Sequence, residues 1–138
     1  MKRPAPIDEE YAFTDGVIVS ETDLNGIITY ANRKFLEISG YSREELIGKP
    51  HSIIRHPDMP KAAFKQMWDT IQADKEWQGL VKNLRKDGRY YWVDTYIKPI
   101  FKEGKKVGYI AARHPAKRMD VISMENTYAK MLEEEKKG

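Results

Sequence analysis

Turns that contain glycine constrain the fold of this chain most. They connect short strand-like segments in pairs, two before and three after a central region with helical patterns. Gly26, Gly88 and Gly104 lie in these turns, and hairpin turns favour glycine. Sequential hairpins pair antiparallel strands, so the pattern predicts an α+β fold: a five-stranded antiparallel sheet with short helices packed on one face. The predicted strands are Val17 to Thr22, Ile27 to Tyr30, Gly79 to Arg85, Tyr90 to Ile100 and Val107 to Arg113.

The longest predicted strand has two distinct faces. Alternation places Trp92 and Tyr96 on one face, and Tyr91, Val93 and Ile97 on the other. Pro99 cannot donate a backbone hydrogen bond. Strand pairing near residue 99 is therefore predicted to be lost or one-sided.

The middle of the chain is predicted to be helical. Asn32 is a cap for a short helix that Gly40 ends, and Ser42 with Glu45 forms a capping-box pattern for a second helix, which ends at Gly48. A longer amphipathic helix is predicted from about Pro60 to Ala73. One more helical turn, capped by Asp8, is predicted over Asp8 to Phe13.

The length of 138 residues fits one domain with short tails. We predict a leader over residues 1–15, a core domain over residues 16–115 and a C-terminal signalling or docking helix over residues 116–138. In this last helix, apolar side chains recur at helical spacing on a charged background. The narrow stripe favours a coiled-coil or docking seam, and the alternative is a helix folded back on its own domain.

Composition excludes several classes of protein. The chain has no cysteine, which rules out disulfides, thiolate metal sites and cysteine nucleophiles and agrees with a cytoplasmic location. No apolar run approaches the roughly 20 residues that a membrane-spanning helix needs, so no direct membrane insertion is expected. The 24 basic and 21 acidic residues are interspersed, and no basic stripe with interleaved aromatic residues predicts a nucleic-acid partner.

The segment from Gly48 to Trp68 concentrates polar side chains beside an amphipathic helix, as expected where a chain surrounds a ligand with a polar edge. Arg55 can make forked contacts to a phosphate or a carboxylate. His56 and Asp58 are close enough in sequence to hydrogen-bond across Pro57, and Asp58 could also cap the following helix. The other two histidines, His51 and His114, are expected at the surface or in turns.

Three motifs together resemble the PAS domain family over residues 17–113: DLNGIITYAN, GYSREELIGKP and KNLRKDGRYYWVD. A fourth, PHSIIRHPDMPKAAFKQMW with the later KEWQGLVKN, resembles the FAD-binding PAS domain of bacterial aerotaxis and energy-taxis receptors. It resembles the redox-sensing PAS domain of nitrogen-fixation regulators more distantly. The resemblance implies a PAS fold that holds FAD without a covalent bond, with FMN as the less expected cofactor. The redox state of the flavin would then be passed to a chemotaxis-type signal transducer.

The resemblance also implies which residues bind the cofactor. Arg55, His56 and Asp58 match an element that the aerotaxis domain needs for FAD. Flavin-binding relatives contact the ring system with the residues that correspond to Trp77 and Asn83. The chemistry agrees, because one amide supplies both a donor and an acceptor for the pyrimidine edge of a flavin, and tryptophans supply stacking area. Two further tryptophans, Trp68 and Trp92, are weaker candidates.

Other functions remain open. A haem-binding or small-ligand PAS sensor is one alternative, with His51 or His56 as an axial ligand, and a ligand-free PAS dimerisation module is another. A light-oxygen-voltage photoreceptor needs a cysteine beside the flavin, and this chain has none. No substrate base or nicotinamide site is present, so we expect a sensor and not an enzyme. The expected partner is a signal transducer or chemoreceptor domain, in cis or as a separate protein, which would carry the domain to the inner face of the membrane; a homodimer is a further expectation.

Overall fold

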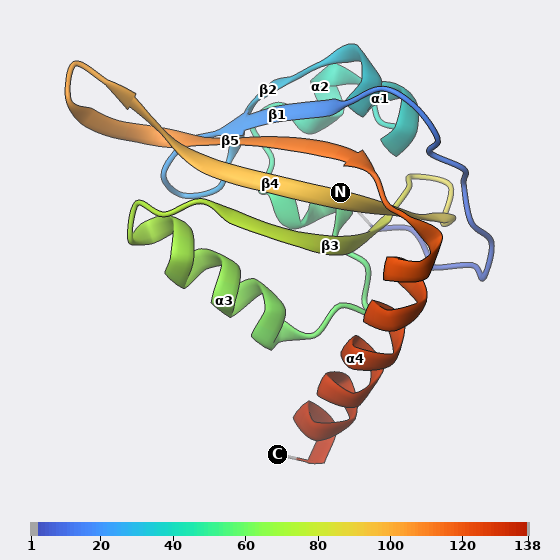
Figure 1. Cartoon of the computed structure of the whole chain (residues 1–138). Helices are drawn as coiled ribbons and strands as arrows, with labels where there is room; N and C mark the ends of the chain where they lie inside the picture. The colour runs from blue at the N-terminus through green and yellow to red at the C-terminus, as the bar shows by residue number, and fades with distance from the viewer. Residues whose placement is uncertain (1–2, 138) are drawn as a thin grey trace.

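The computed structural model describes residues 3–137, which form a five-stranded antiparallel sheet with helices packed against it (Figure 1). The strand order across the sheet is β2-β1-β5-β4-β3, so the first and last strands in the chain lie side by side. The predicted α+β architecture is confirmed. The strands are β1 (Ile18–Thr22), β2 (Ile28–Ala31), β3 (Trp77–Leu84), β4 (Tyr90–Lys102) and β5 (Lys105–Pro115).

Strand β4 is the longest and has one-sided pairing at its end, as Pro99 predicted. Its pairing with β3 ends where Trp77 meets Ile97, and beyond this point β4 pairs only with β5, including Pro99 with Tyr109. The missing N–H of Pro99 is therefore tolerated because no strand lies on one side of it.

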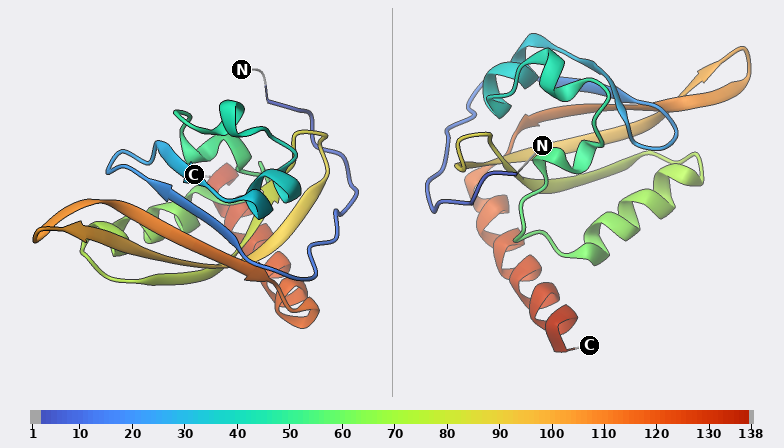
Figure 2. Two further views of the ribbon diagram at one scale, coloured as in Figure 1. Left: turned by 90° about the horizontal axis from the view of Figure 1, so that it is seen from above. Right: turned by 180° about the vertical axis from the view of Figure 1, so that it is seen from behind.

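Four short helical segments precede β3: α1 (Arg33–Ser39), α2 (Arg43–Leu46), the 3-10 helix η1 (His51–Ile54) and α3 (Lys61–Gln72). The predicted caps are confirmed. Asn32 Oδ1 accepts a hydrogen bond from the backbone N–H of Phe35 at 3.0 Å, and Ser42 and Glu45 form both bonds of a capping box. Figure 2 shows α1, α2 and α3 arranged along the sheet, so that the helical layer and the sheet enclose the interior of the domain.

The predicted helical turn over Asp8 to Phe13 is wrong, because this segment is extended. The Tyr11 N–H donates to the Tyr90 carbonyl at 2.8 Å, and the Tyr90 N–H donates to the Glu9 carbonyl at 3.0 Å. The ring of Tyr11 contacts two guanidinium groups, and its centroid lies 3.7 Å from that of Arg85 and 4.9 Å from that of Arg89. These partners lie about 75 residues away in sequence, so no local signal indicated them.

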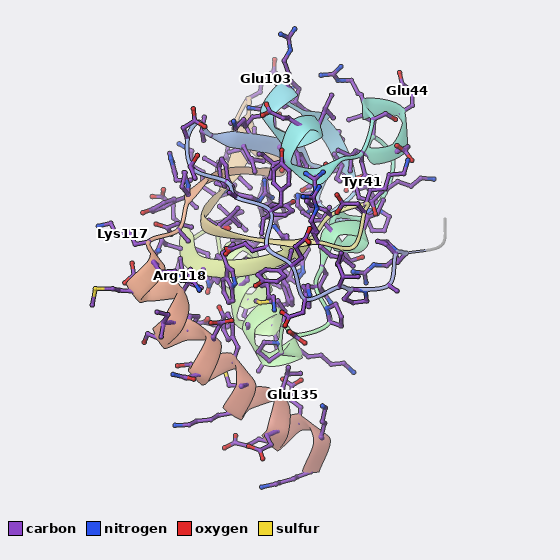
Figure 3. The ribbon with its side chains drawn as sticks, turned by 90° about the vertical axis from the view of Figure 1, so that its right-hand side faces the viewer. Tyr41, Glu44, Glu103, Lys117, Arg118 and Glu135 are labelled. Atoms are coloured by element: carbon purple, nitrogen blue, oxygen red, sulfur yellow. The ribbon has the colours of Figure 1, made fainter. Side chains whose placement is uncertain are left out.

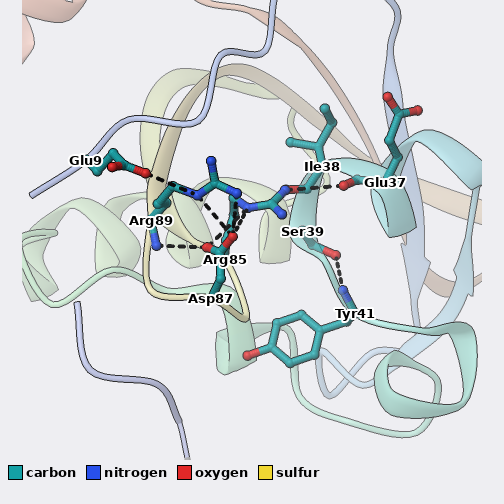
Figure 4. A network of polar contacts seen from close by, with 8 residues as sticks. All are labelled: Glu9, Glu37, Ile38, Ser39, Tyr41, Arg85, Asp87 and Arg89. Carbon is teal, nitrogen blue, oxygen red and sulfur yellow. Dashed lines mark hydrogen bonds and ion pairs between the residues drawn. The ribbon is translucent and has the colours of Figure 1, made fainter. Parts of the chain in front are cut away.

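Both arginines belong to a polar network at the β3–β4 turn (Figure 4). Arg85 donates to the carbonyls of Glu37 and Ile38 at the end of α1, and Asp87 accepts hydrogen bonds from both Arg85 and Arg89. Since last-turn carbonyls lack partners within their own helix, Arg85 acts as a C-terminal cap for α1. The network therefore ties the N-terminal segment, α1 and the β3–β4 turn together.

The C-terminal helix α4 (Arg118–Lys137) packs on its own domain, as the second of the two predictions has it, and its signalling or docking role stays a prediction. Tyr128 of α4 stacks on Trp92 with an interplanar angle of 4°, and its hydroxyl donates to the Leu80 carbonyl at 2.6 Å. The Glu135 carboxylate accepts from the N–H groups of residues 61 and 62, the first turn of α3, at 3.1 and 3.0 Å (Figure 3). The domain therefore buries Val121 and Tyr128 of the apolar stripe of α4, and the rest of the stripe is half-buried.

The apolar core is one continuous cluster between the sheet and the helices, and it includes Val121 and Tyr128 of α4. Alternation along β4 is as predicted, since Tyr91 and Val93 face the core on the cavity side and Trp92 faces α4. Within residues 3–137, no helix combines the length and the apolar character needed to cross a membrane.

Candidate functional site

A cavity of about 240 Å³ lies between the sheet and the layer formed by η1 and α3. Strands β1, β3, β4 and β5 form its floor, and the β1–β2 turn closes one end. The exposed residues Asn25 and Ser52 lie at its rim, so the cavity opens to solvent there. Its polar lining residues include Ser20, His51, Arg55, Asn83, Thr95 and Arg113.

The most polar part of the cavity is a cluster of three side chains from β1, η1 and β5. Arg113 donates to Ser20 Oγ at 3.0 Å, and its second terminal nitrogen lies 2.7 Å from His51 Nε2. Ser20 Oγ is 3.1 Å from the same histidine nitrogen. Because a guanidinium can only donate, His51 Nε2 is an acceptor here and the imidazole is neutral.

The charge of Arg113 has no acidic partner in this cavity. The side chain is 4% exposed, and among the described residues that line the cavity there is no aspartate or glutamate. Burial lowers the pKa of Arg113 to about 10, which leaves it protonated at neutral pH. Burial, followed by the nearby charge of Arg113, lowers the pKa of His51 from 6.5 to about 3. The cavity therefore carries a buried positive charge beside a neutral histidine.

This depressed pKa predicts that acid destabilises the fold. An unfolded His51 binds a proton near pH 6.5 and the folded one only near pH 3, so its contribution to stability is complete above pH 6.5 and is lost as the pH falls towards 3. The expected loss is up to about 1.4 kcal/mol per pH unit. We expect His51→Gln to reduce the difference between urea unfolding free energies at pH 7 and pH 5. His114→Gln, at an exposed position on β5, serves as the control and should leave this difference unchanged; an unchanged difference in His51→Gln would contradict the assignment.

Of the residues that the sequence proposed for cofactor binding, Arg55, Trp68 and Asn83 line the cavity. The Arg55 guanidinium lies 3.8 Å from the centre of the Phe64 ring, and its buried Nε has no hydrogen-bond partner. The Trp68 ring packs edge-on against Tyr109, at 5.8 Å between centroids. The aromatic rings of Phe64 and Trp68 thus form apolar walls, and Arg55 Nε is a buried donor that a ligand could engage.

His56 and Asp58 lie outside the cavity and organise the loop between η1 and α3. His56 Nδ1 accepts the Asp58 N–H at 3.0 Å, and the Asp58 carboxylate pairs with Lys82 at 2.9 Å. Burial, followed by the charge of Lys82, lowers the pKa of His56 to about 4, so this imidazole is neutral as well. Both residues hold the loop that carries Arg55 against β3.

Trp77 and Trp92 also lie outside the cavity. The Trp77 ring covers Gly79, where a Cβ atom would lie only 2.5 Å from it, and Trp77 Nε1 donates to Gln66 at 3.4 Å. Trp92 faces α4, on the side of the sheet opposite the cavity-facing residues of β4. The two rings pack helices against the sheet.

Ser20 and Arg113 were not proposed from the sequence, and His51 was proposed only as a ligand in the haem alternative. His51, which was expected at the surface or in a turn, is half-buried in the 3-10 turn η1, and its ring lines the cavity and stacks on Phe35 at 5.7 Å. Alternation along β5 carried a usable signal for Arg113, because it shares one face with Tyr109 and Ala111, and all three line the cavity.

Comparisons with known proteins agree with this fold. The PAS fold family model matches residues 28–113. The aerotaxis receptor of Escherichia coli (strain K12) is 46% identical over 114 residues, which is 83% of this chain and 22% of the receptor. A nitrogen fixation regulatory protein of Klebsiella pneumoniae is 32% identical over 96 residues, 69% of this chain and 19% of that protein. The chain thus spans about a fifth of the length of these relatives.

Solved structures are also similar over most of the chain. The crystal structure of the PAS domain of a protein from Colwellia psychrerythraea superposes with a TM-score of 0.66 and 26% sequence identity. The match covers 72% of this chain and 86% of that one. The fold is therefore shared with an experimentally determined PAS domain.

Proposed function

This chain belongs to the PAS fold family, and from that premise we propose that it is a sensory domain that holds a flavin, FAD in preference to FMN, and reports its redox state to a taxis signal transducer. A bound flavin would supply reversible electron uptake. The protein would act as a sensor and not as an enzyme. Its resemblance to an aerotaxis receptor over 83% of its length supports the taxis assignment.

The observation that carries the proposal is the uncompensated charge of Arg113. A buried cation is costly unless it is paired, and the described lining of the cavity contains no carboxylate to pair with it. An electron-rich or anionic ligand edge would complete the site. Flavins present such an edge in their pyrimidine ring, and reduction adds negative charge to it, which Arg113 would stabilise.

The remaining cavity residues fit the same ligand. The Asn83 amide can donate and accept at once, and Thr95 Oγ1 and Arg55 Nε are buried without hydrogen-bond partners. Trp68 and Phe64 offer apolar and aromatic surface for a planar ring system. We assign the ring system to the part of the cavity that Asn83 lines. The backbone of Arg55 pairs with that of Asn83, so the Arg55 guanidinium would donate to polar atoms of the cofactor beside the ring.

The other residues that the sequence proposed would act indirectly. His56 and Asp58 would position Arg55 through the loop that they hold, and Trp77 would fix α3 against β3. Trp92 would pass changes in the sheet to α4 through Tyr128. A unit of charge that reduction adds to the flavin, about 6 Å from a charged side chain, would be worth roughly 2–3 kcal/mol at an effective dielectric of 20. A free energy of this size is enough to shift an equilibrium between two arrangements of the sheet and α4.

The test is purification in the dark, followed by an absorption scan and identification of the nucleotide released on denaturation. We expect flavin bands and FAD, with loss of colour in Arg113→Met and retention of colour in His114→Gln. A Soret band would instead favour a haem sensor. A preparation that stays colourless after incubation with excess FAD or FMN would refute flavin binding.

A further inference from the structure

The β4–β5 hairpin extends beyond the rest of the sheet as a free arm, which we define as residues 98–107. Pairing of β4 with β3 ends at Ile97, and pairing of β5 with β1 ends at Tyr109. Between these points the two strands pair only with each other. Figures 1 and 2 show the arm projecting past the other strands, so its end is free to contact another surface.

The arm combines exposed apolar side chains with unpaired lysines. Phe101 is 51% exposed and Val107 40% exposed near its turn. Lys98, Lys102 and Lys105 are exposed, and none of them forms an ion pair with any residue in the part of the chain that the structure describes.

The two remaining charged residues of the arm, Lys106 and Glu103, do not cancel the charge of these three lysines. Lys106 is already engaged, with its ammonium 2.8 Å from Asp74 at the end of α3. Glu103 is the one acidic residue within residues 98–107. Lys102 and Lys105 pair with each other beside the turn, Phe101 lies on the opposite face of the hairpin and Lys98 lies at its base. The arm therefore presents three available positive charges together with an exposed aromatic ring.

We propose that this arm binds the surface of an anionic lipid bilayer. Lysines attract anionic headgroups, while a phenylalanine next to the turn can enter the boundary between headgroups and acyl chains. The arm is narrow and convex, whereas a specific protein interface buries about 800 Å² on each partner. A bilayer accepts such a projection without a complementary groove, which favours lipid over an acidic protein.

If the free end of the arm contacts the bilayer, the opening of the cavity would also lie towards the bilayer. The base of the arm lies against the β1–β2 turn, since a Cβ atom at Gly108 would meet the carbonyl oxygen of Thr22 and Cα of Asp23. The same turn carries Asn25 at the rim of the cavity and the exposed side chain of Leu24. The arm would therefore hold the opening of the cavity close to the membrane surface.

Sedimentation with vesicles tests the charge requirement. We expect binding to phosphatidylcholine vesicles that contain phosphatidylglycerol, and none to phosphatidylcholine alone. Each lysine near an anionic surface contributes about fivefold, so Lys102→Glu with Lys105→Glu should weaken binding on the order of 25-fold or more. The matched control is Lys117→Glu with Lys130→Glu, which makes the same charge change at exposed positions beside and on α4 and should bind nearly as the parent does.

Because the chain has no cysteine, one introduced cysteine gives a unique label for the second test. An environment-sensitive fluorophore at Phe101→Cys should shift to the blue with the anionic vesicles, and the same label at Met119→Cys, an exposed site on α4, should not. The proposal is overturned by absent binding at low salt, by equal losses in the two charge-reversal pairs, or by equal shifts at the two labels. Binding of an acidic polypeptide or nucleic acid in preference to these vesicles would also overturn it.

Discussion

Gly108→Ala is expected to lower the free energy of unfolding by about 3 kcal/mol or more, because β5 approaches β1 too closely there for any side chain. A Cβ atom at this position would lie 2.0 Å from the Thr22 carbonyl oxygen and 3.1 Å from its carbon. Both are backbone atoms of β1, so relief requires the strands to separate at the cavity end of the sheet. Urea denaturation followed by tryptophan fluorescence measures the loss.

Gly104→Ala is the matched control for this prediction. Gly104 has a φ of +79° in the β4–β5 turn, and a Cβ atom added there would have no neighbouring atom within 4 Å. Alanine there should cost only about 1–2 kcal/mol, from the left-handed backbone conformation alone. Equal destabilisation by the two substitutions would show that the close approach of β5 to β1 does not exclude a side chain at position 108.

Arg113→Met is expected to have two opposite effects on the protein. Without a ligand, the variant should be more stable by about 1–4 kcal/mol, because an apolar side chain of similar length replaces a buried, unpaired cation. Ser20 and His51 remain paired with each other at 3.1 Å, so neither loses its last partner. With flavin nucleotide present, the variant should fail to retain the cofactor that the parent retains.

Arg113→Lys separates charge from geometry in this prediction. A lysine keeps the positive charge and loses the fork that reaches both Ser20 and His51. We therefore expect no gain in stability without ligand and only weakened flavin retention. If Arg113→Met is less stable than the parent without ligand, burial of the Arg113 charge does not destabilise the fold as we infer. This conclusion would hold whether or not the variant retains flavin.

Local sequence signals predicted most of the secondary structure. Asn32 and the pair Ser42 and Glu45 act on neighbouring backbone groups, so their effect can be read from a few consecutive residues. The N-terminal segment shows the opposite case. Its expected helical turn depended on Asp8, but Tyr11 pairs with β4 and contacts two distant arginines.

The candidate site was only partly predictable for the same reason. The resemblance favoured Trp77 over Trp68 and Trp92, yet only Trp68 lines the cavity, since Trp77 packs under α3 and Trp92 packs under α4. His51 and Arg113 are 62 residues apart and meet only because β5 lies beside β1. The family resemblance, confirmed by the comparisons, identified the fold but did not identify these two residues.

The sequence by itself determined the strands, the capped helices and a polar segment between residues 48 and 68, because these depend on backbone preferences and short-range hydrogen bonds. Only the tertiary structure decided which polar side chains of that segment face the cavity. It also decided that a buried arginine from the last strand lies among them without an acid. That choice depends on strand order and on which face each side chain occupies, and both are set by packing between segments far apart in the chain.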